Sequence, residues 1–403
     1  MAYIKEIKYF NCFLIKDADN RFHIEESRIK GDFNGKSVDY GVRAHITDPE
    51  YAQETRENAM IHSGVYNSRT GVNNLNQFPI DQAITISVDI QQGSIQKLFA
   101  EDQVLNIFQE EKVRYVPIDK DIIYTAEGVP LSAASNVFLG DVVAYGTNYG
   151  IGKNPESFSS YSGRKYFVDK PKGAVLRLSR DGITEISDYG MRSFFRNNLS
   201  NSSRIYTAWD IHSKDLIVTV IKPTDSFTVA FDESVNGWSS FFSYIPSGFS
   251  GSIDGKFYTF KGVDLYEHHA TDYYNRFYGQ DHESYVEFVL NANPSLNKNF
   301  LTINYEGSDS WNISNIETDT DIAFPIPEYS IYNEDLLMSA FQKNNNKYYS
   351  NLINASEPSG GEVDFGGSMS GIKGYYAKVK AETRSSDYKE LFSVSSNYNP
   401  NSY

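Results

Sequence analysis

The segment Arg164–Ser187 contains three short strand-forming stretches that are separated by two tight-turn signals. Aromatic, β-branched and other apolar residues dominate the stretches, as is usual in strands. The turns are Lys170–Gly173 and Ser179–Gly182, whose Pro, Gly and Asp residues favour chain reversal. The segment therefore predicts a β-meander, and looser versions of it recur along the chain.

Similar short strand-forming runs follow one another from Ser94 to about Gly307 in roughly four groups. Groups of four strands every ~40–50 residues are typical of β-propeller blades. We therefore predict an all-β fold with few helices, built from β-propeller-like four-stranded meander blades between irregular N- and C-terminal β regions. Sandwiches and stacked sheets give similar strand spacing and remain alternatives. The runs outside the opening segment are 95–99, 104–108, 113–117, 122–124, 205–210, 216–221, 227–231, 238–244, 256–260, 264–268, 285–290 and 300–305.

The sequence predicts three regions: an N-terminal mixed β region over residues 1–93, propeller-like blades over 94–310, and a C-terminal β region and tail over 311–403. Helices are expected at two places. Asp48–Met60 begins with a Pro and several acidic residues, which suit a helix start, and Tyr189–Leu199 interrupts the strand pattern.

The C-terminal region contains a clear alternating pattern at Lys373–Ala381, which predicts a strand. The apolar run Leu391–Ser395 is expected to pair with it. The last residues, Asn397–Tyr403, are expected to fray or to become ordered on contact with a partner.

Aromatic residues make up 15% of the chain, with 30 Tyr and 26 Phe, which suits strands and interfaces. The set Trp238, Phe241, Phe242, Tyr244 and Tyr273–Tyr278 exceeds what a small core needs. We expect half of it to face the core and the rest to face a partner. Trp238 is predicted to lie in a blade core, so that Trp238→Ala costs about 3–5 kcal/mol.

The formal net charge of the chain is -15. This balance argues against a cationic surface that neutralises phosphates as the main function of the chain. An acidic wall would instead let nucleic acid pass without adhering to it.

No metal or cofactor is expected. The single cysteine, Cys12, cannot form an intrachain disulfide and is interpreted as a small core residue.

Among seven histidines, His268 and His269 are adjacent on a predicted strand, where neighbouring side chains point to opposite faces. The acidic run Glu317–Asp321 is interpreted as a solvated loop. Asp17–Asn20 predicts a hairpin turn and not a calcium loop, because Arg21 occupies the fifth position.

No catalytic motif is found, and the chain is predicted not to be an enzyme. Gly146–Asn154 differs from a phosphate loop in its spacing and lacks a Ser or Thr after Lys153, so it is interpreted as a glycine-rich loop against another backbone. Ser179–Thr184 resembles the Asp-box turn of sialidases, but its Gly is one position early and the Trp is absent. A Gly-x-Ser-x-Gly elbow is also missing.

No apolar run approaches the ~20 residues that span a bilayer. Met1–Lys8 has no apolar core of a signal peptide, so synthesis in the cytoplasm is expected.

Several segments resemble the nozzle, muzzle or stabilisation proteins of the tails of crAss-like and related short-tailed bacteriophages. The resemblance spans about residues 20 to 395, and members of the family are often much longer. The segments are 149–157, 173–187, 188–192, 231–238, 258–262 and 300–307.

The resemblance implies a structural virion protein of the tail that assembles in the bacterial host cytoplasm. It implies a homo-oligomeric, usually sixfold ring below the portal and ring proteins, with ring or adaptor, fibre and portal-proximal proteins as partners. Such a ring stays closed until infection and then conducts DNA and ejected proteins. No catalytic, cofactor or metal residue is implied.

Two other functions remain open from sequence. Open blade faces could bind or cleave host glycans through carboxylates and aromatic residues. A periplasmic or secreted scaffold unrelated to phage is the third possibility.

Overall fold

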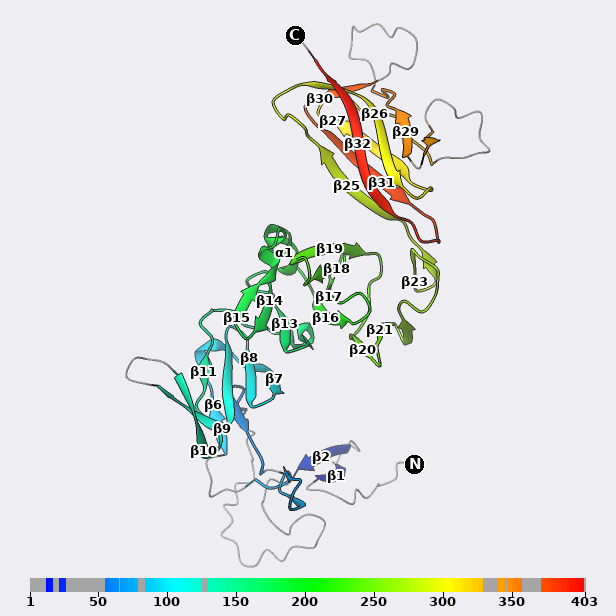
Figure 1. Cartoon of the computed structure of the whole chain (residues 1–403). Coiled ribbons are helices and arrows are strands. Elements are labelled where there is room, and N and C mark those ends of the chain that lie inside the picture. The colour runs from blue at the N-terminus through cyan, green and yellow to red at the C-terminus, as the bar shows by residue number, and fades with distance from the viewer. Residues whose placement is uncertain are drawn as a thin grey trace, which may run out of the picture. The chain divides into compact units, whose positions relative to one another are not determined.

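The computed structural model describes the strands 12–16 and 22–26 and then residues 55–64, 66–78, 84–124, 130–328, 340–345, 347–356 and 371–401. These residues are mainly β and form small antiparallel sheets (Figure 1). The chain divides into two compact units, residues 1–207 and 208–403. The region boundaries at 93/94 and 310/311 remain predictions.

The elements of the first unit begin with a hairpin and end with β16, within which the division into units falls. They are β1 (Cys12–Lys16), β2 (Phe22–Glu26), β3 (Ala59–Ile61), β4 (Tyr66–Asn67), β5 (Val72–Asn73), β6 (Thr85–Ser87), η1 (Ile90–Gln92), β7 (Ile95–Glu101), β8 (Val104–Gln109), β9 (Val113–Tyr124), β10 (Pro130–Leu139), β11 (Val143–Ala144), η2 (Pro155–Ser157), β12 (Ser159–Tyr161), β13 (Arg164–Asp169), β14 (Ala174–Ser179), β15 (Gly182–Glu185), η3 (Ile186–Asp188), α1 (Arg192–Leu199) and β16 (Arg204–Asp210).

The described elements of the second unit are all strands. They are β17 (Asp215–Ile221), β18 (Phe227–Asp232), β19 (Gly237–Phe242), β20 (Ser250–Ile253), β21 (Lys256–Lys261), β22 (Asp264–Glu267), β23 (Arg276–Phe277), β24 (Gln280–Asp281), β25 (Ser284–Leu290), β26 (Lys298–Gly307), β27 (Asn312–Thr318), β28 (Gln342–Asn344), β29 (Lys347–Asn351), β30 (Ile372–Gly374), β31 (Ala377–Thr383) and β32 (Leu391–Pro400).

The meander predicted at Arg164–Ser187 is confirmed, and β12 completes it to a four-stranded sheet in the order β12-β13-β14-β15. Ser179 lies opposite Gly182, so the second turn has Arg180 and Asp181 at its centre. Gly182 has a φ of 101°, a value that favours glycine. The residues of this turn thus fix the hairpin at the position that the sequence predicted.

The next strands form a second four-stranded meander, β16-β17-β18-β19, and then a three-stranded one, β20-β21-β22. Among the predicted runs, 113–117 and 122–124 belong to one strand, β9, in the sheet β10-β9-β8-β7. The runs 285–290 and 300–305 do not pair with each other, because β25 pairs with β31 whereas β26 pairs with β29, β30 and β32.

One predicted helix is confirmed and one is wrong where it is described. Helix α1 covers most of Tyr189–Leu199 and buries Phe195 and Leu199, which lie four residues apart on one helix face. Within Asp48–Met60, the described residues from Thr55 form a turn and the start of β3, which pairs with β6. Tertiary pairing therefore overrides the helix signal there, and the earlier residues lie outside the described part.

The C-terminal strands form two sheets, β25-β31-β27 and β28-β29-β26-β30 with β32 beside β26. Side chains of β26 and β29 from one sheet and of β27 and β31 from the other share one buried cluster, as in a β-sandwich. The expected pairing of Leu391–Ser395 with Lys373–Ala381 is wrong, because β32 pairs with β26. Residues 397–400 belong to β32 and pair with β26, so the expectation that they fray is wrong.

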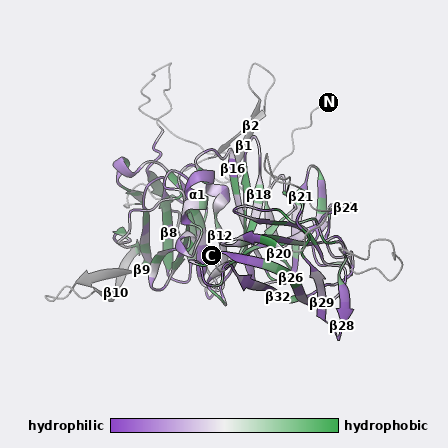
Figure 2. Ribbon diagram, turned by 90° about the horizontal axis from the view of Figure 1, so that it is seen from above, coloured by the Kyte–Doolittle hydropathy of each residue, from purple (hydrophilic) through white to green (hydrophobic). Residues whose placement is uncertain are grey.

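Hydrophobic residues lie mainly in the interior strands of the sheets, whereas exposed strands such as β28 are hydrophilic (Figure 2). No described helix is long and apolar enough to cross a membrane.

Candidate interaction surface

The two four-stranded meanders have central strands that are buried on both faces. In β13, five consecutive residues after Arg164 are buried, and β17 likewise buries Leu216–Val220. Since neighbouring strand residues point to opposite faces, both faces of each strand are covered. Phe167 and Leu176 of the first meander share a core with Phe108 and Val113 of the preceding sheet.

The three-stranded sheet β20-β21-β22 is covered on one face. Phe257 of β21 is fully buried and shares a cluster with Ile217 and Ala230 of the neighbouring meander and with Tyr244. Thr259, two residues further on, is also buried. These positions define the inner face of the sheet.

The opposite face of this sheet, here called the outer face, exposes apolar side chains. The register places Ile253 opposite Lys256, Tyr258 opposite Glu267, and Phe260 opposite Leu265, all on this face. The exposed fractions of Ile253, Leu265 and Phe260 are 72%, 57% and 43%.

A turn and an ion pair complete the outer face. Val263, in the turn between β21 and β22, is 96% exposed. Lys256 Nζ lies 2.9 Å from Glu267 Oε1, and the Tyr258 hydroxyl donates to Glu267 Oε2 at 3.2 Å. The outer face is therefore an apolar surface with a self-neutralised ion pair.

The first half of the predicted aromatic set divides between core and surface. Tyr244 is buried and Phe242 packs against its cluster, whereas Phe241 is exposed. Trp238 is half-buried and packs edge-to-face on Phe231 with ring centroids 5.1 Å apart. The prediction that Trp238 is a core residue is correct in direction but overstates its burial.

The run Tyr273–Tyr278 divides in the same way. Phe277 and Tyr278 pack against the cluster around Tyr244, and the Tyr278 hydroxyl lies 2.8 Å from Thr259 Oγ1. Tyr273 and Tyr274 are exposed.

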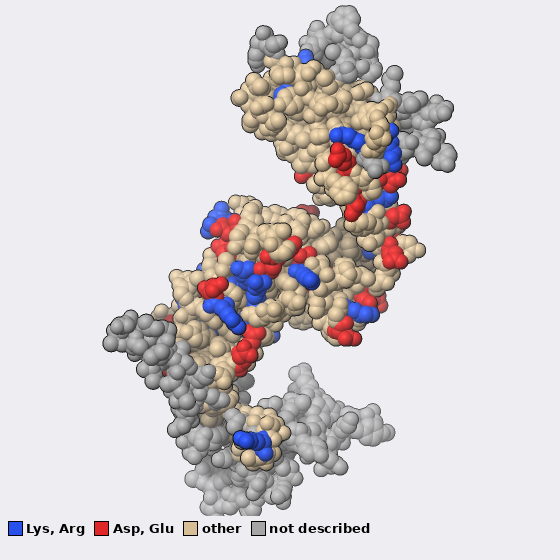
Figure 3. Space-filling model, in the orientation of Figure 1, with Lys and Arg blue, Asp and Glu red and all other residues tan. Residues whose placement is uncertain are grey.

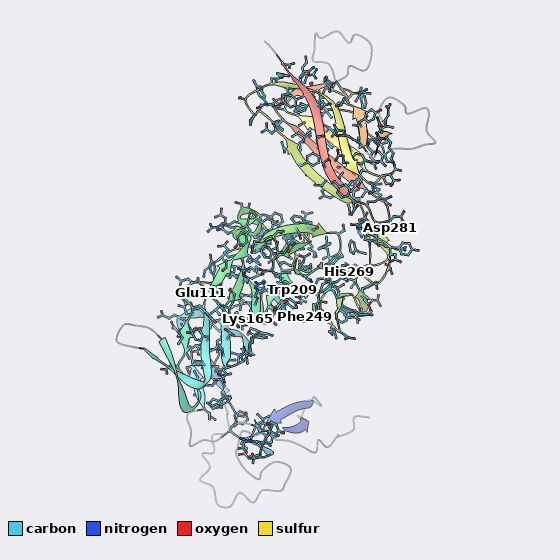
Figure 4. The ribbon with its side chains drawn as sticks, in the orientation of Figure 1. Glu111, Lys165, Trp209, Phe249, His269 and Asp281 are labelled. Carbon is cyan, nitrogen blue, oxygen red and sulfur yellow. The ribbon has the colours of Figure 1, made fainter. Side chains whose placement is uncertain are left out.

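His268 and His269 lie in the turn that follows β22, so the prediction that they are adjacent on a strand is wrong, although their environments differ. His268 Nε2 lies 2.7 Å from Thr259 Oγ1, and burial lowers the pKa of His268 to about 4. His269, labelled in Figure 4, has its Nε2 2.8 Å from Asp210 Oδ2 and stacks on His212 at a centroid distance of 4.1 Å. Within the described ranges, no group of three His, Cys, Asp or Glu side chains is arranged to hold a metal ion.

Two aspartates near these histidines titrate differently. Burial raises the pKa of Asp210, but hydrogen bonds from His269 and from the His212 amide outweigh it and hold the pKa below its usual value. The pKa of Asp215 is raised to about 6, first by burial and then by Asp232, which lies directly opposite on β18. Hydrogen bonding and ring stacking therefore hold Asp210, His212 and His269 together, whereas Asp215 is a carboxyl group with a raised pKa.

The glycine-rich loop Gly146–Asn154 packs against another backbone, as predicted. The amide of Gly150 donates to Asp169 Oδ2 at 3.0 Å, and that of Gly152 donates to Glu110 O at 2.9 Å. A Cβ at Gly150 would lie 2.2 Å from the Glu110 oxygen. Because these two amides already donate hydrogen bonds within the protein, they are not available to bind a phosphate.

The acidic run Glu317–Asp321 has a structural role, which the solvated-loop interpretation missed. Asp319 Oδ1 accepts from the Tyr375 amide and Asp321 Oδ2 from the Lys373 amide, each at 2.7 Å. These two hydrogen bonds thus fix the backbone around β30.

The β1–β2 hairpin is confirmed, whereas its turn at Asp17–Arg21 and the Cys12 side chain lie outside the described residues.

Sequence reasoning missed Lys298, whose residue is fully buried at the start of β26. Its Nζ donates to Asn293 O at 3.0 Å and to Leu296 O at 2.8 Å. Lys298 and Phe300 are both buried and lie two residues apart, so strand alternation could have indicated an inward side chain.

Comparison with known proteins gives a consistent family. The model described as "Crassvirus muzzle protein" matches residues 78–263, and "Crassvirus muzzle protein C-terminal domain" matches residues 272–355. A curated relative, the muzzle protein of Bacteroides phage crAss001, is 23% identical over an aligned length of 258 residues, and the alignment covers 59% of this chain. The aligned part spans 17% of the length of that relative.

Proposed function

This chain belongs to the crassvirus muzzle protein family, and we propose that it is a structural protein of a phage tail and not an enzyme. The family match over the meander sheets and over part of the sandwich is the observation that supports this proposal most strongly. The curated relative is itself a phage muzzle protein.

The chain forms part of a ring-shaped nozzle that closes the tail lumen and then conducts DNA and ejected proteins. Its meander sheets stand as propeller-like blades in the wall of this ring, which is a homo-oligomer, sixfold as in the resemblance. Ring or adaptor, fibre and portal-proximal proteins are its neighbours, and the ring assembles in the host cytoplasm.

Charge supports the conduit role. The net charge of -15 disfavours adhesion of DNA to the wall. Within each unit, the described basic and acidic side chains are intermixed on the face seen in Figure 3, and they form no continuous basic stripe there that would track a phosphate backbone.

Immunogold labelling of intact phage particles with an antibody against this chain tests the proposal. Gold is expected at the tail below the portal, and purified tails are expected to contain the chain in a ring. Absence of the chain from washed virions, or a monomer that binds host polysaccharide, would contradict the proposal and favour the glycan-binding alternative.

A further inference from the structure

We propose that the contact between Asp210 and His269 is a proton-dependent clip, which holds the sheet β20-β22 more firmly on the meander β16-β19 when the His269 imidazole is protonated. The inference goes beyond the proposed tail function and does not depend on it. Asp210 is the last residue of β16, whereas His269 follows β22, so their contact joins the two sheets.

Three polar contacts at the end of β16 join the meander to the sheet. Ser252 Oγ donates to Trp209 O at 2.6 Å and accepts from the Ile211 amide at 3.1 Å. His269 Nε2 lies 2.8 Å from Asp210 Oδ2, and Figure 4 labels His269 and Trp209. Hydroxyl and amide groups do not change their charge over the ordinary pH range, whereas an imidazole does. The Asp210–His269 contact is therefore the one of these three that can respond to pH.

Asp210 is a buried carboxylate that gains from a positive partner. Its side chain is 5% exposed. Burial raises its pKa, but hydrogen bonds from His269 and from the His212 amide outweigh this and keep the group ionised. Among the described residues, no Lys or Arg forms an ion pair with Asp210. Since a buried carboxylate without a cation is costly, a proton on His269 stabilises the state in which the two sheets are in contact.

The backbone holds His269 in position for this contact. His269 has a φ of 58°, in the left-handed region that few residues other than glycine adopt. The amide of His268 donates to Phe257 O at 2.9 Å and so ties the turn to β21. The imidazole of His269 is therefore held against Asp210 by its own sheet, before it takes up a proton.

Two further carboxyl groups lie near Asp210, and their charges act in the same direction. Burial, and then Asp232 directly opposite on β18, raise the pKa of Asp215 to about 6. When they are ionised, both groups add negative charge around Asp210, which favours a positive His269. Tyr244 also faces Asp210, but burial raises the pKa of its hydroxyl, so this group stays neutral.

Two other histidines limit the charge that the clip can hold. Burial lowers the pKa of His268 to about 4, so this ring stays neutral above that pH. The His212 ring stacks on His269 at a centroid distance of 4.1 Å. Protons on both stacked rings would bring two positive charges together, so the pair favours a single proton. The clip should therefore be closed with one proton on the pair and weaken as pH rises and this proton is lost.

Hydrogen–deuterium exchange of the full-length chain, corrected for the intrinsic pH dependence of amide exchange, tests the clip. Peptides that cover β21 and β22 are expected to exchange at least about fivefold more slowly at about pH 6 than at about pH 8. Peptides that cover β13, in the other unit, should keep the same corrected rate. Equal corrected rates in β21 and β22 at the two pH values would overturn the proposal.

Two variants assign the pH dependence to a residue. His269→Gln retains a donor for Asp210 but cannot take up a proton, so it should abolish the pH dependence of exchange in β21 and β22. Asp215→Asn removes the other nearby group that titrates near pH 6 and should leave this dependence in place. The control His62→Gln changes a histidine in the other unit and should have no effect. A pH dependence that survives His269→Gln, or that disappears in Asp215→Asn, would refute the clip.

Discussion

The meander β16-β19 and the sheet β20-β22 are built from similar hairpins, yet they differ in what covers them. Strand β18 buries four consecutive residues, Thr228–Phe231, whereas β21 buries only alternate ones. Strand pairing alone therefore does not decide stability, because the covered faces carry most of the hydrophobic free energy. Residues on covered faces stabilise the fold, whereas residues on an exposed face are available to bind a neighbouring protein.

The largest expected effect comes from equal truncations in the two sheets. Phe231→Ala, at a fully buried position, should lower the free energy of unfolding by about 3–5 kcal/mol. Phe260→Ala, at a 43% exposed position, should lower it by about 1 kcal/mol or less. Urea unfolding of the full-length chain measures both. Similar losses would show that coverage does not distinguish the sheets.

The loop that contains Gly150 gives the next largest effect, in the unit with the first meander. Gly150→Ala would place a Cβ 2.2 Å from the Glu110 oxygen, so we expect a loss of about 2–3 kcal/mol. Gly146→Ala is the matched control, because nothing lies within 4 Å of its Cβ. Thermal unfolding compares them, and equal melting temperatures would contradict the packing described for this loop.

Trp238 tests the intermediate case between a covered and an open face. Its ring packs on Phe231 but stays half-exposed on β19. Trp238→Ala should therefore cost about 1–3 kcal/mol, less than the cost for a fully buried Trp. Denaturant unfolding gives the value. A normal fold with lost self-association would instead place Trp238 in the contact between copies.

The smallest effect concerns pH. Since the pKa of Asp215 is raised to about 6 in the fold, the folded state keeps its proton when the unfolded state has lost it. Stability should then fall as pH rises from about 4 to above 6, by at most ~1–2 kcal/mol because solvent screens this half-exposed group. Asp215→Asn should flatten this part of the stability profile. An unchanged slope in the variant would exclude Asp215 as its cause.

Local signals made part of the fold predictable. In Arg164–Ser187 the turn residues and the apolar runs agree, and the pairing is between neighbours in sequence. Strand β32 could not be assigned in this way, since its partner β26 lies far away in the chain and competes with other alternating segments. The Asp48–Met60 helix failed for the same reason, because pairing of β3 with β6 is non-local.

The candidate surface was less predictable than the fold. In Lys256–Lys261, aromatic residues alternate on both faces, so the sequence gives no sign of which face a neighbouring sheet covers. The buried cluster with Ile217 and Ala230 decides it. The aromatic set around Trp238 was found from composition, but its division between core and surface depends on tertiary packing.

Cryo-electron microscopy of the intact phage tail tests the account most directly. The account predicts that copies of this chain form a closed ring around the lumen. A chain that lies outside the tail channel, or copies that do not close into a ring, would contradict it.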